Sequence, residues 1–578
     1  MATIDLQPKE NKSPSAQATI TGAEAVVRSL LAEGVDIAFG YPGGAIMPVY
    51  DALYDYQDTL HHVLARHEQG AIHAAQGYAR ASGKVGVCLA TSGPGATNLI
   101  TGIADAQIDS TPLVCITGQV PSALLGSDAF QETDVIGISM PVTKWNYQVT
   151  TAEEIPSALA KAFYIARSGR PGPVLIDITK DAQFQELDFS YQACEFIRSY
   201  REEPNIELDK IQEAADAINS AERPFVLFGQ GVILANAEEE FRAFIEKANL
   251  PAAWTILGLS ALETDHPLNV GMLGMHGNYG PNLLTNECDV LIAVGMRFDD
   301  RVTGNLSKYA KQAKVIHLEI DPAEINKNVF AHIPVMGNAK KTLPLLTERL
   351  QAKEHPEWLA RFKECDDLEH EKVIQDELHP KHDILSMGEV IHILNEKTGG
   401  DAIIVTDVGQ HQMVACRYAE FVRSKSNITS GGLGTMGFGL PAALGAALGA
   451  PDRTVVCVVG DGGLQMTIQE LATIHQTQAR VKVLLLNNEF LGMVRQWQQL
   501  FFDKRYSSTE MINPDFQQLA KGFRMNTNQV TDRSQLDQAL TEFIESEGSY
   551  FLEVMVGKEN NVFPMVPSGS GVAEIRLE

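Results

Sequence analysis

VVCVVGDGGLQMTIQELATIHQTQARVKVLLLNN, residues 455–488, is the segment around which the rest of this chain is organised. Its two apolar runs, Val455–Val459 and Val481–Leu486, have the length and composition of buried strands. Apolar residues recur at helical spacing between them, so the stretch predicts a strand, a turn, a helix and a second strand. Ligands of such units gather at the carboxyl ends of the strands, where Asp461 and Asn488 stand.

The residues at these strand ends suit a metal ion and a diphosphate. The carboxylate of Asp461 and the amide oxygen of Asn488 are hard ligands for Mg²⁺, which often keeps phosphate oxygens in its shell. Gly460, Gly462 and Gly463 let backbone N–H groups approach the phosphates. An Asp-Gly pair after a strand is usually only a turn. The longer pattern favours a site, because GDG, 24 further residues and then NN resemble the thiamine diphosphate signature.

Composition bounds the class of protein. A chain of 578 residues predicts three or four domains, and 44% hydrophobic with 21% charged residues is typical of soluble globular proteins. The formal charge of −27 argues against nucleic acid or an anionic membrane as partner. The seven cysteines form no CxxC pair, so we expect reduced, buried thiols and a cytoplasmic location.

Strand-like and helix-like segments alternate along most of the chain, which predicts an α/β fold of three doubly wound parallel-sheet domains. A charged stretch at 351–385 is expected to be a solvated helix and linker. The uncharged stretch 431–451 is expected to be a glycine-rich turn and a helix buried between domains. The predicted organisation is a flexible tail 1–18, domains 19–190, 206–350 and 384–558, and an irregular tail 559–578.

Three local patterns leave alternatives open. Thr91–Gly95 follows a strand and opens a helix, so it is either a phosphate loop or an ordinary helix entry. Gly229-Gln230-Gly231 also follows a strand, but Leu234 stands where a dinucleotide fingerprint requires its third glycine. Asp321 could bind a ribose hydroxyl or could cap the helix that starts at Pro322.

Over about residues 19–567 the chain resembles the catalytic subunits of acetohydroxyacid synthase (acetolactate synthase). The resemblance implies two thiamine diphosphate domains, 19–190 for the pyrimidine and 384–558 for the diphosphate and Mg²⁺, flanking an FAD domain at 206–350. The motifs that carry it are FGYPGGAIMPVYDAL, RHEQGAIHAAQGYARASG, TSGPGATNLITGIADA, DAFQETD, SGRPGPVLIDITKD, RFDDRVTG, TDVGQHQM, GGLGTMGFGLPAALGAA, GDGGLQM and NNEFLGMVRQWQ.

The resemblance also implies an activity. Pyruvate would be decarboxylated on thiamine diphosphate, and the two-carbon unit would join a second pyruvate or 2-oxobutyrate. The products would be 2-acetolactate or 2-aceto-2-hydroxybutyrate. Their formation would be the first common step of branched-chain amino acid biosynthesis. The flavin would have no net redox role. Rival interpretations are a pyruvate oxidase-like enzyme, a flavin-free acetolactate synthase and a non-catalytic nucleotide sensor; the first lacks the combination of RFDDRVTG and Gln-Trp, and RFDDR disfavours the second.

Site residues follow from the same resemblance. The implied catalytic residues are Glu68, which would activate the thiamine, with Gln131 and Lys180. The implied thiamine contacts, beside Glu68 and the GDGG turn, are Gly409, Gln410, His411, Met436 and Met493. The metal ligands would be Asp461, Asn488 and the backbone carbonyl of Phe490. The implied flavin contacts are Met275, His276, Arg297, Asp299 and Asp321, and the substrate contacts are Arg301 and Trp497.

Several of these residues have plainer interpretations. Arg301 could form a surface ion pair with Asp299 or Asp300, and Met436 could be ordinary core. Trp497, about three helical turns beyond Asn488 if that segment is helical, could pack in a domain interface. The resemblance further implies a homodimer or tetramer with active sites between chains, and a separate small regulatory subunit.

Overall fold

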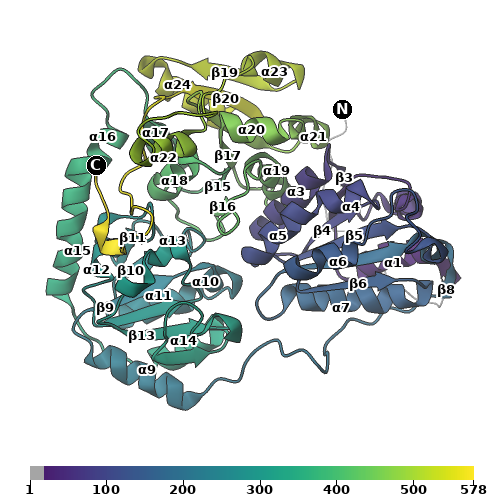
Figure 1. Ribbon diagram of the computed structural model, residues 1–578, viewed down its shortest axis with the longest axis horizontal. Helices are drawn as coiled ribbons and strands as arrows, with labels where there is room; N and C mark the ends of the chain where they lie inside the picture. The colour runs from purple at the N-terminus through teal and green to yellow at the C-terminus, as the bar shows by residue number, and fades with distance from the viewer. Residues whose placement is uncertain (1–18) are drawn as a thin grey trace.

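The computed structural model describes residues 19–578 (Figure 1). Three six-stranded parallel sheets covered by helices follow one another along the chain, which confirms the predicted fold class. The tail expected at 1–18 lies outside the described residues. None of the helices in residues 19–578 combines the length and the hydrophobicity that crossing a bilayer requires.

The first sheet has the strand order β3-β2-β4-β5-β7-β6, and a short antiparallel pair, β1 and β8, lies beside it. The strands are β1 (Thr19–Thr21), β2 (Ile37–Gly40), β3 (His61–Leu64), β4 (Gly86–Ala90), β5 (Leu113–Gln119), β6 (Trp145–Val149), β7 (Pro173–Thr179) and β8 (Glu186–Asp188). The helices are α1 (Gly22–Ala32), α2 (Met47–Leu53), α3 (Glu68–Ser82), α4 (Pro94–Asn98), α5 (Ile100–Ile108), α6 (Val135–Ser139), α7 (Ile155–Arg167) and α8 (Lys180–Phe184).

The central sheet has the order β11-β10-β9-β12-β13-β14, which in chain order is 3-2-1-4-5-6, the order of dinucleotide-binding sheets. The strands are β9 (Pro224–Phe228), β10 (Ala252–Trp254), β11 (Asn269–Met272), β12 (Val290–Val294), β13 (Lys314–Glu319) and β14 (Ile333–Met336). The helices are α9 (Leu208–Ser220), α10 (Gln230–Leu234), α11 (Glu238–Lys247), α12 (Tyr279–Leu284), α13 (Asp300–Thr303) and α14 (Ala339–Thr347).

The third sheet, β16-β15-β17-β18-β20-β19, repeats the topology of the first, since both read 2-1-3-4-6-5 in chain order. The strands are β15 (Ile403–Thr406), β16 (Asn427–Thr429), β17 (Val455–Gly460), β18 (Val481–Asn487), β19 (Asn526–Val530) and β20 (Tyr550–Met555). The helices are α17 (Met387–Thr398), α18 (Gln410–Tyr418), α19 (Gly439–Gly449), α20 (Asp461–Thr467), α21 (Glu470–Thr477), α22 (Gly492–Phe501), α23 (Phe516–Gly522) and α24 (Arg533–Glu545).

The charged segment before the third domain is helical, as α15 (Pro356–Glu369) and α16 (Gln375–Leu378), but it is not simply solvated. Trp358 and Phe362 of α15 are buried against the central domain. Glu369 forms a fully buried ion pair with Arg417, whose Nη2 lies 2.5 Å from the carboxylate. The expectation was wrong on this face because a count of charges does not reveal an apolar stripe at helical spacing.

The first and third domains meet where α3 crosses α19, near the centre of Figure 1. The prediction of a buried helix after the glycine-rich turn is confirmed, since nearly all of α19 is buried. The helices approach closely because small residues face each other. A Cβ atom at Gly445 would overlap the backbone oxygen of Ala74, and one at Gly77 would overlap the backbone oxygen of Ala442.

The last twenty residues are irregular, as expected, but they are packed against two domains. Val562 and Val572 are buried, and the N–H of Val566 donates to the carbonyl of Met275 at 2.8 Å. In Figure 1 this segment, drawn in yellow, runs from the third domain down to the central one. It therefore connects these two domains and does not project as a loose tail.

The α3–α19 crossing yields a test of the fold. Gly445→Ala places a methyl group against backbone that cannot move freely, so we expect a destabilisation of about 1–3 kcal/mol. The measurement is the urea midpoint of unfolding, which should fall. Gly522→Ala is the matched control, since an added Cβ there meets open space within the described chain. Equal midpoints for both variants would contradict the close-packing interpretation.

Candidate functional site

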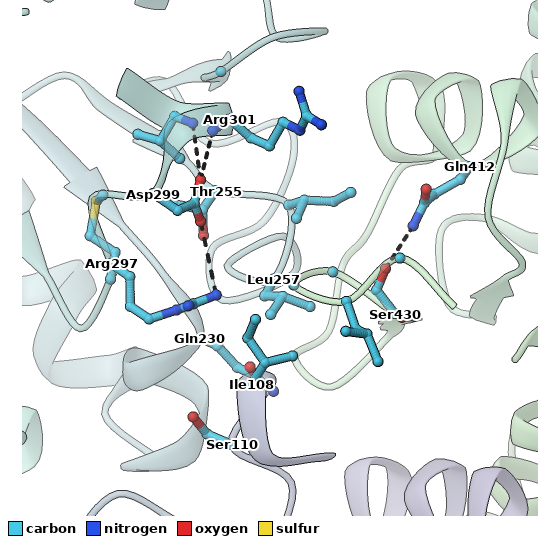
Figure 2. A pocket seen from close by; sticks show the side chains of 18 of the residues that line it. Ile108, Ser110, Gln230, Thr255, Leu257, Arg297, Asp299, Arg301, Gln412 and Ser430 are labelled. Atoms are coloured by element: carbon cyan, nitrogen blue, oxygen red, sulfur yellow. Dashed lines mark hydrogen bonds and ion pairs between the residues drawn. The ribbon is translucent and has the colours of Figure 1, made fainter. Parts of the chain in front are cut away.

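One cavity of about 1320 Å³ lies where the three domains meet (Figure 2). Pockets for a single small molecule usually measure about 300–1,000 Å³, so this one has room for more than one ligand. In the central sheet it lies beyond β9 and β12, where the strand order reverses. In the third sheet it lies beyond β15, β17 and β18. These are the positions at which open α/β sheets bind ligands.

The third-domain wall carries the residues predicted for the metal. Asp461 opens α20 and is 1% exposed, and its Oδ2 accepts from Asn513 Nδ2 at 2.7 Å. Burial raises the pKa of Asp461 to about 6, and the Asn513 contact opposes this shift. Asn488 and Phe490 line the same cavity, and Asn488 Nδ2 lies 3.4 Å from Gln410 Oε1.

This set of donors fits Mg²⁺ held together with phosphates. Within residues 19–578, no group of three or more His, Cys, Asp or Glu side chains could hold a metal ion alone. Besides Asp461, the ion would therefore need amide and carbonyl oxygens of the protein and oxygens of the bound phosphates. Mg²⁺ is commonly bound in this way.

The glycines around Asp461 have no room for a side chain. A Cβ atom at Gly462 would lie 2.6 Å from the Leu491 side chain, and one at Gly460 would lie 2.8 Å from Nδ1 of His411. Gly463 and Gly409 line the cavity beside them. Glycine is therefore required at 460 and 462 by packing against the protein itself, and the approach of a phosphate to this backbone stays a prediction.

Two buried histidines face the cavity with an unpaired ring nitrogen. Nε2 of His411 and Nδ1 of His276 have no hydrogen-bond partner within residues 19–578. Burial lowers the pKa of each to about 4, and the Arg417 charge adds to the effect at His276. Both rings are thus neutral near pH 7. Such orphaned polar atoms call for a partner, and a bound ligand would supply one.

The central-domain wall brings together four of the five predicted flavin contacts. Met275, His276, Arg297 and Asp299 all line the cavity. Figure 2 shows Arg297 extended toward Asp299, with 3.9 Å between Nη2 and Oδ2. Asp299 also caps α13, accepting from the N–H of Arg301 at 3.0 Å. Burial raises the pKa of Asp299, an effect that the Arg297 charge opposes.

Asp321 has a different role. Its Oδ1 accepts from the N–H of Ala323 at 3.0 Å, and its Oδ2 pairs with Arg170 at 3.1 Å. Among the described residues it does not line the cavity, whereas Glu319 and Glu324 nearby do. Of the two alternatives for Asp321 the structure supports the cap, so its place among the flavin contacts is unsupported.

The two predicted substrate residues both line the cavity. The side chain of Arg301 is 64% exposed and lies 3.9 Å from Asp300, too long for a tight ion pair. Trp497 lies on α22 beside Met493. It is not three helical turns beyond Asn488, because α22 starts only at Gly492. The preceding residues instead form a bridge, in which Phe490 pairs with Glu510.

The three predicted catalytic residues lie elsewhere, at the carboxyl end of the first sheet. Glu68 opens α3, is 9% exposed and accepts from Asn98 Nδ2 at 2.9 Å. Gln131 packs against Gly93 of the TSGPG loop, and Lys180 opens α8 after β7. Among residues 19–578, none of these three lines the large cavity. The chain thus carries two separate groups of site residues.

Sequence reasoning missed the polar partners of the key carboxyl groups. Asn98 holds Glu68, and Asn513 holds Asp461. Asn98 could have been found from its place in the TSGPGATN motif, one turn after Pro94. Asn513 lies 52 residues beyond Asp461 in an irregular segment, and no local pattern marks it.

Three models of one enzyme family match consecutive parts of the chain. Residues 20–138 match the model of the thiamine pyrophosphate enzyme N-terminal TPP binding domain. Residues 211–346 match the thiamine pyrophosphate enzyme central domain. Residues 407–554 match the thiamine pyrophosphate enzyme C-terminal TPP binding domain.

Whole-chain relatives agree with these matches. The chain is 46% identical to the acetolactate synthase isozyme 2 large subunit of Escherichia coli over 557 residues, covering 96% of this chain and 99% of that protein. It is 45% identical to the acetolactate synthase large subunit of Corynebacterium glutamicum, covering 96% and 90%. A probable acetolactate synthase large subunit of Methanocaldococcus jannaschii is also 45% identical, covering 96% and 95%. These names favour the acetolactate synthase interpretation over the pyruvate oxidase-like one.

The metal assignment can be tested with two graded variants. Asp461→Ala removes the only carboxylate ligand proposed for Mg²⁺, so we expect the affinity for Mg²⁺ with thiamine diphosphate to fall at least about 100-fold. Asn513→Ala removes only the partner of that ligand and should cost about 10- to 100-fold. Titration calorimetry measures both, and circular dichroism checks the fold. Wild-type affinity in folded Asp461→Ala would refute the assignment.

Proposed function

The chain belongs to the acetolactate synthase large subunits, a family of thiamine pyrophosphate enzymes, and from this membership we propose how its residues share the reaction. The enzyme decarboxylates pyruvate and joins the two-carbon unit to a second 2-keto acid. A second pyruvate gives 2-acetolactate, and 2-oxobutyrate gives 2-aceto-2-hydroxybutyrate. The observation that carries the proposal is the single cavity in which the GDGG turn meets a sheet of dinucleotide-binding order.

The third-domain half of the cavity would hold thiamine diphosphate and Mg²⁺. Asp461, the Asn488 amide oxygen and the Phe490 carbonyl would hold the ion, and the N–H groups of the GDGG turn would approach the diphosphate. The apolar side chains of Met436 and Met493 would support the ring system. When bound, thiamine diphosphate supplies the nucleophilic carbon and accepts the negative charge left by decarboxylation.

The central half of the cavity would hold FAD. The order of its sheet, the turn at Gln230-Gly231 and the unpaired nitrogen of His276 support a dinucleotide there. Arg297 would face the diphosphate of the flavin nucleotide. In this proposal FAD is structural, since the reaction has no net oxidation or reduction.

A second copy of the chain would complete each active site. Within residues 19–578, Glu68, Gln131 and Lys180 lie outside the cavity of their own chain, which supports a site that they complete in another chain. The buried Glu68 carboxyl would orient the cofactor and move a proton at its pyrimidine ring. Lys180 and Arg301 would attract the substrate carboxylates.

A regulatory partner belongs to the same proposal. The relatives are named large subunits, which supports a separate small regulatory subunit for this chain. We place the reaction at the first common step of branched-chain amino acid synthesis.

Product analysis tests the proposed function directly. The purified chain, given pyruvate, Mg²⁺, thiamine diphosphate and FAD, should form 2-acetolactate detectable by NMR, without oxygen uptake. Replacing FAD with a redox-inactive analogue should preserve the product. Acetate formation coupled to oxygen uptake would contradict the proposal.

Acceptor choice gives a residue-level prediction. The indole of Trp497 in the cavity wall would contact the extra methyl group of 2-oxobutyrate, and one methylene in an apolar pocket is worth about 10- to 200-fold in selectivity. Trp497→Leu should therefore shift the product ratio toward parity in a competition of pyruvate with 2-oxobutyrate. Phe502→Leu, at the end of the same helix, is the control. An unchanged ratio in active Trp497→Leu would reject this role.

A further inference from the structure

The loop that joins β16 to α19 forms a wall of the cavity and is held by a different domain. Ser430, Gly431, Gly432, Leu433, Gly434 and Met436 of this loop all line the cavity. We call residues 430–436 the glycine loop. It ends in Met436, the residue proposed to support the thiamine rings. Its shape therefore sets the space that the cofactor can occupy.

Two carboxylates of the first domain bind the glycine loop. Asp109, the residue that caps the carboxyl end of α5, accepts from the N–H of Gly431 at 2.8 Å and from the N–H of Gly432 at 2.7 Å. Asp105, one turn earlier, accepts from the hydroxyls of Ser430 and Thr435, the latter at 3.0 Å. The two acids thus hold both ends of the loop.

The packing around the glycine loop leaves its backbone little room to move. A Cβ atom at Gly432 would lie 2.8 Å from Ile108, and one at Gly431 would lie 2.6 Å from Leu257 of the central domain. Figure 2 shows Ile108, Leu257 and Ser430 close together at this three-domain junction. Gln412 of α18 donates to the Ser430 carbonyl at 3.1 Å. The glycines are thus held close to both carboxylates and both neighbouring domains.

The charge of Asp109 is not a stabilising feature by itself. The residue is 1% exposed, lies at the unfavourable carboxyl end of a helix and is near Asp105. Its nearest cation, Arg80 of α3, is 3.8 Å away. Burial and Asp105 raise the pKa of Asp109 to about 6, against the effects of Arg80 and the loop N–H groups. Because the folded-state pKa exceeds the unfolded value, the charge reduces folding stability at neutral pH.

From these contacts we propose that Asp105 and Asp109 are positioning residues, which hold the glycine loop of the third domain in the shape that receives thiamine diphosphate. The inference rests on the proposed function, because it assumes that this cavity binds that cofactor. Beyond the proposed function, it assigns the first domain a second role in the site. Besides offering Glu68 to another chain, it would shape the cofactor cavity of its own chain.

Asp109→Asn is the most informative variant. An asparagine has one acceptor oxygen, so its NH₂ group would face one of the two loop N–H groups and push the loop away. We expect the affinity for thiamine diphosphate with Mg²⁺ to fall about 10- to 100-fold, as for a lost hydrogen bond to a charged group. The melting temperature of the cofactor-free chain should not fall, because a buried charge is removed. A merely structural residue would lower both quantities together.

The experiment compares the full-length wild type with Asp109→Asn and a buried control. Asp177→Asn is the control, since Asp177 is equally buried in the first domain but, among residues 19–578, accepts only from Thr117, Gln119 and Gln148 of that domain. Calorimetry measures cofactor binding, and hydrogen exchange by mass spectrometry follows the peptide 429–437. We expect weaker binding and faster exchange in Asp109→Asn alone.

The outcomes separate the inference from the proposed function. Binding within twofold of the wild type, or unchanged exchange in a folded variant, would overturn the positioning role. A wild type that binds no thiamine diphosphate would instead overturn the proposed function. Thr435→Val removes the hydroxyl that the loop donates to Asp105, and if Asp109→Asn does not fold it gives the same comparison of cofactor binding and hydrogen exchange, without the melting-temperature criterion.

Discussion

The close crossing of α3 and α19 is the contact on which the arrangement of the sites depends. Only glycine at 77 and 445 lets the two backbones approach this closely. The amino end of α3 carries Glu68, and its other end carries Arg80, which donates to the Thr429 carbonyl at 2.6 Å. The crossing therefore fixes the position of the first-domain site residues relative to the third-domain cavity. It also brings α5, with Asp105 and Asp109, against the loop before α19.

Topology explains why one chain carries two separate groups of predicted site residues. The first and third sheets share one strand order, while the central sheet has the dinucleotide order. In each sheet, polar loops follow the strands at the point where the strand order reverses. One chain therefore has three sheet edges that could bind a ligand. Two of them open into the common cavity, and the one that carries Glu68 does not. A symmetric pair of chains can supply the missing edge to each cavity.

Much of this was predictable from sequence because the signals were local. The GDGG turn, Asn488 and the buried helix after the glycine loop all follow from runs of residues with clear periodicity, and they lie where expected. The buried pair of Glu369 and Arg417 was not predictable, since the two residues are 48 positions apart. Asn513 was missed for the same reason. The sequence left the cap and the ribose contact of Asp321 open, and the choice needed the structure, in which its Oδ1 accepts from the N–H of Ala323.

If an active site combines Glu68 of one chain with Asp461 of another, mixing two inactive variants should restore activity. Glu68→Gln and Asp461→Ala chains would each be assayed alone and after subunit exchange, with exchange verified by native mass spectrometry. Random exchange makes half of the dimers mixed, each with one intact site, so about a quarter of wild-type acetolactate formation should return. No recovery in verified mixed dimers would contradict a site shared between Glu68 and Asp461 of different chains.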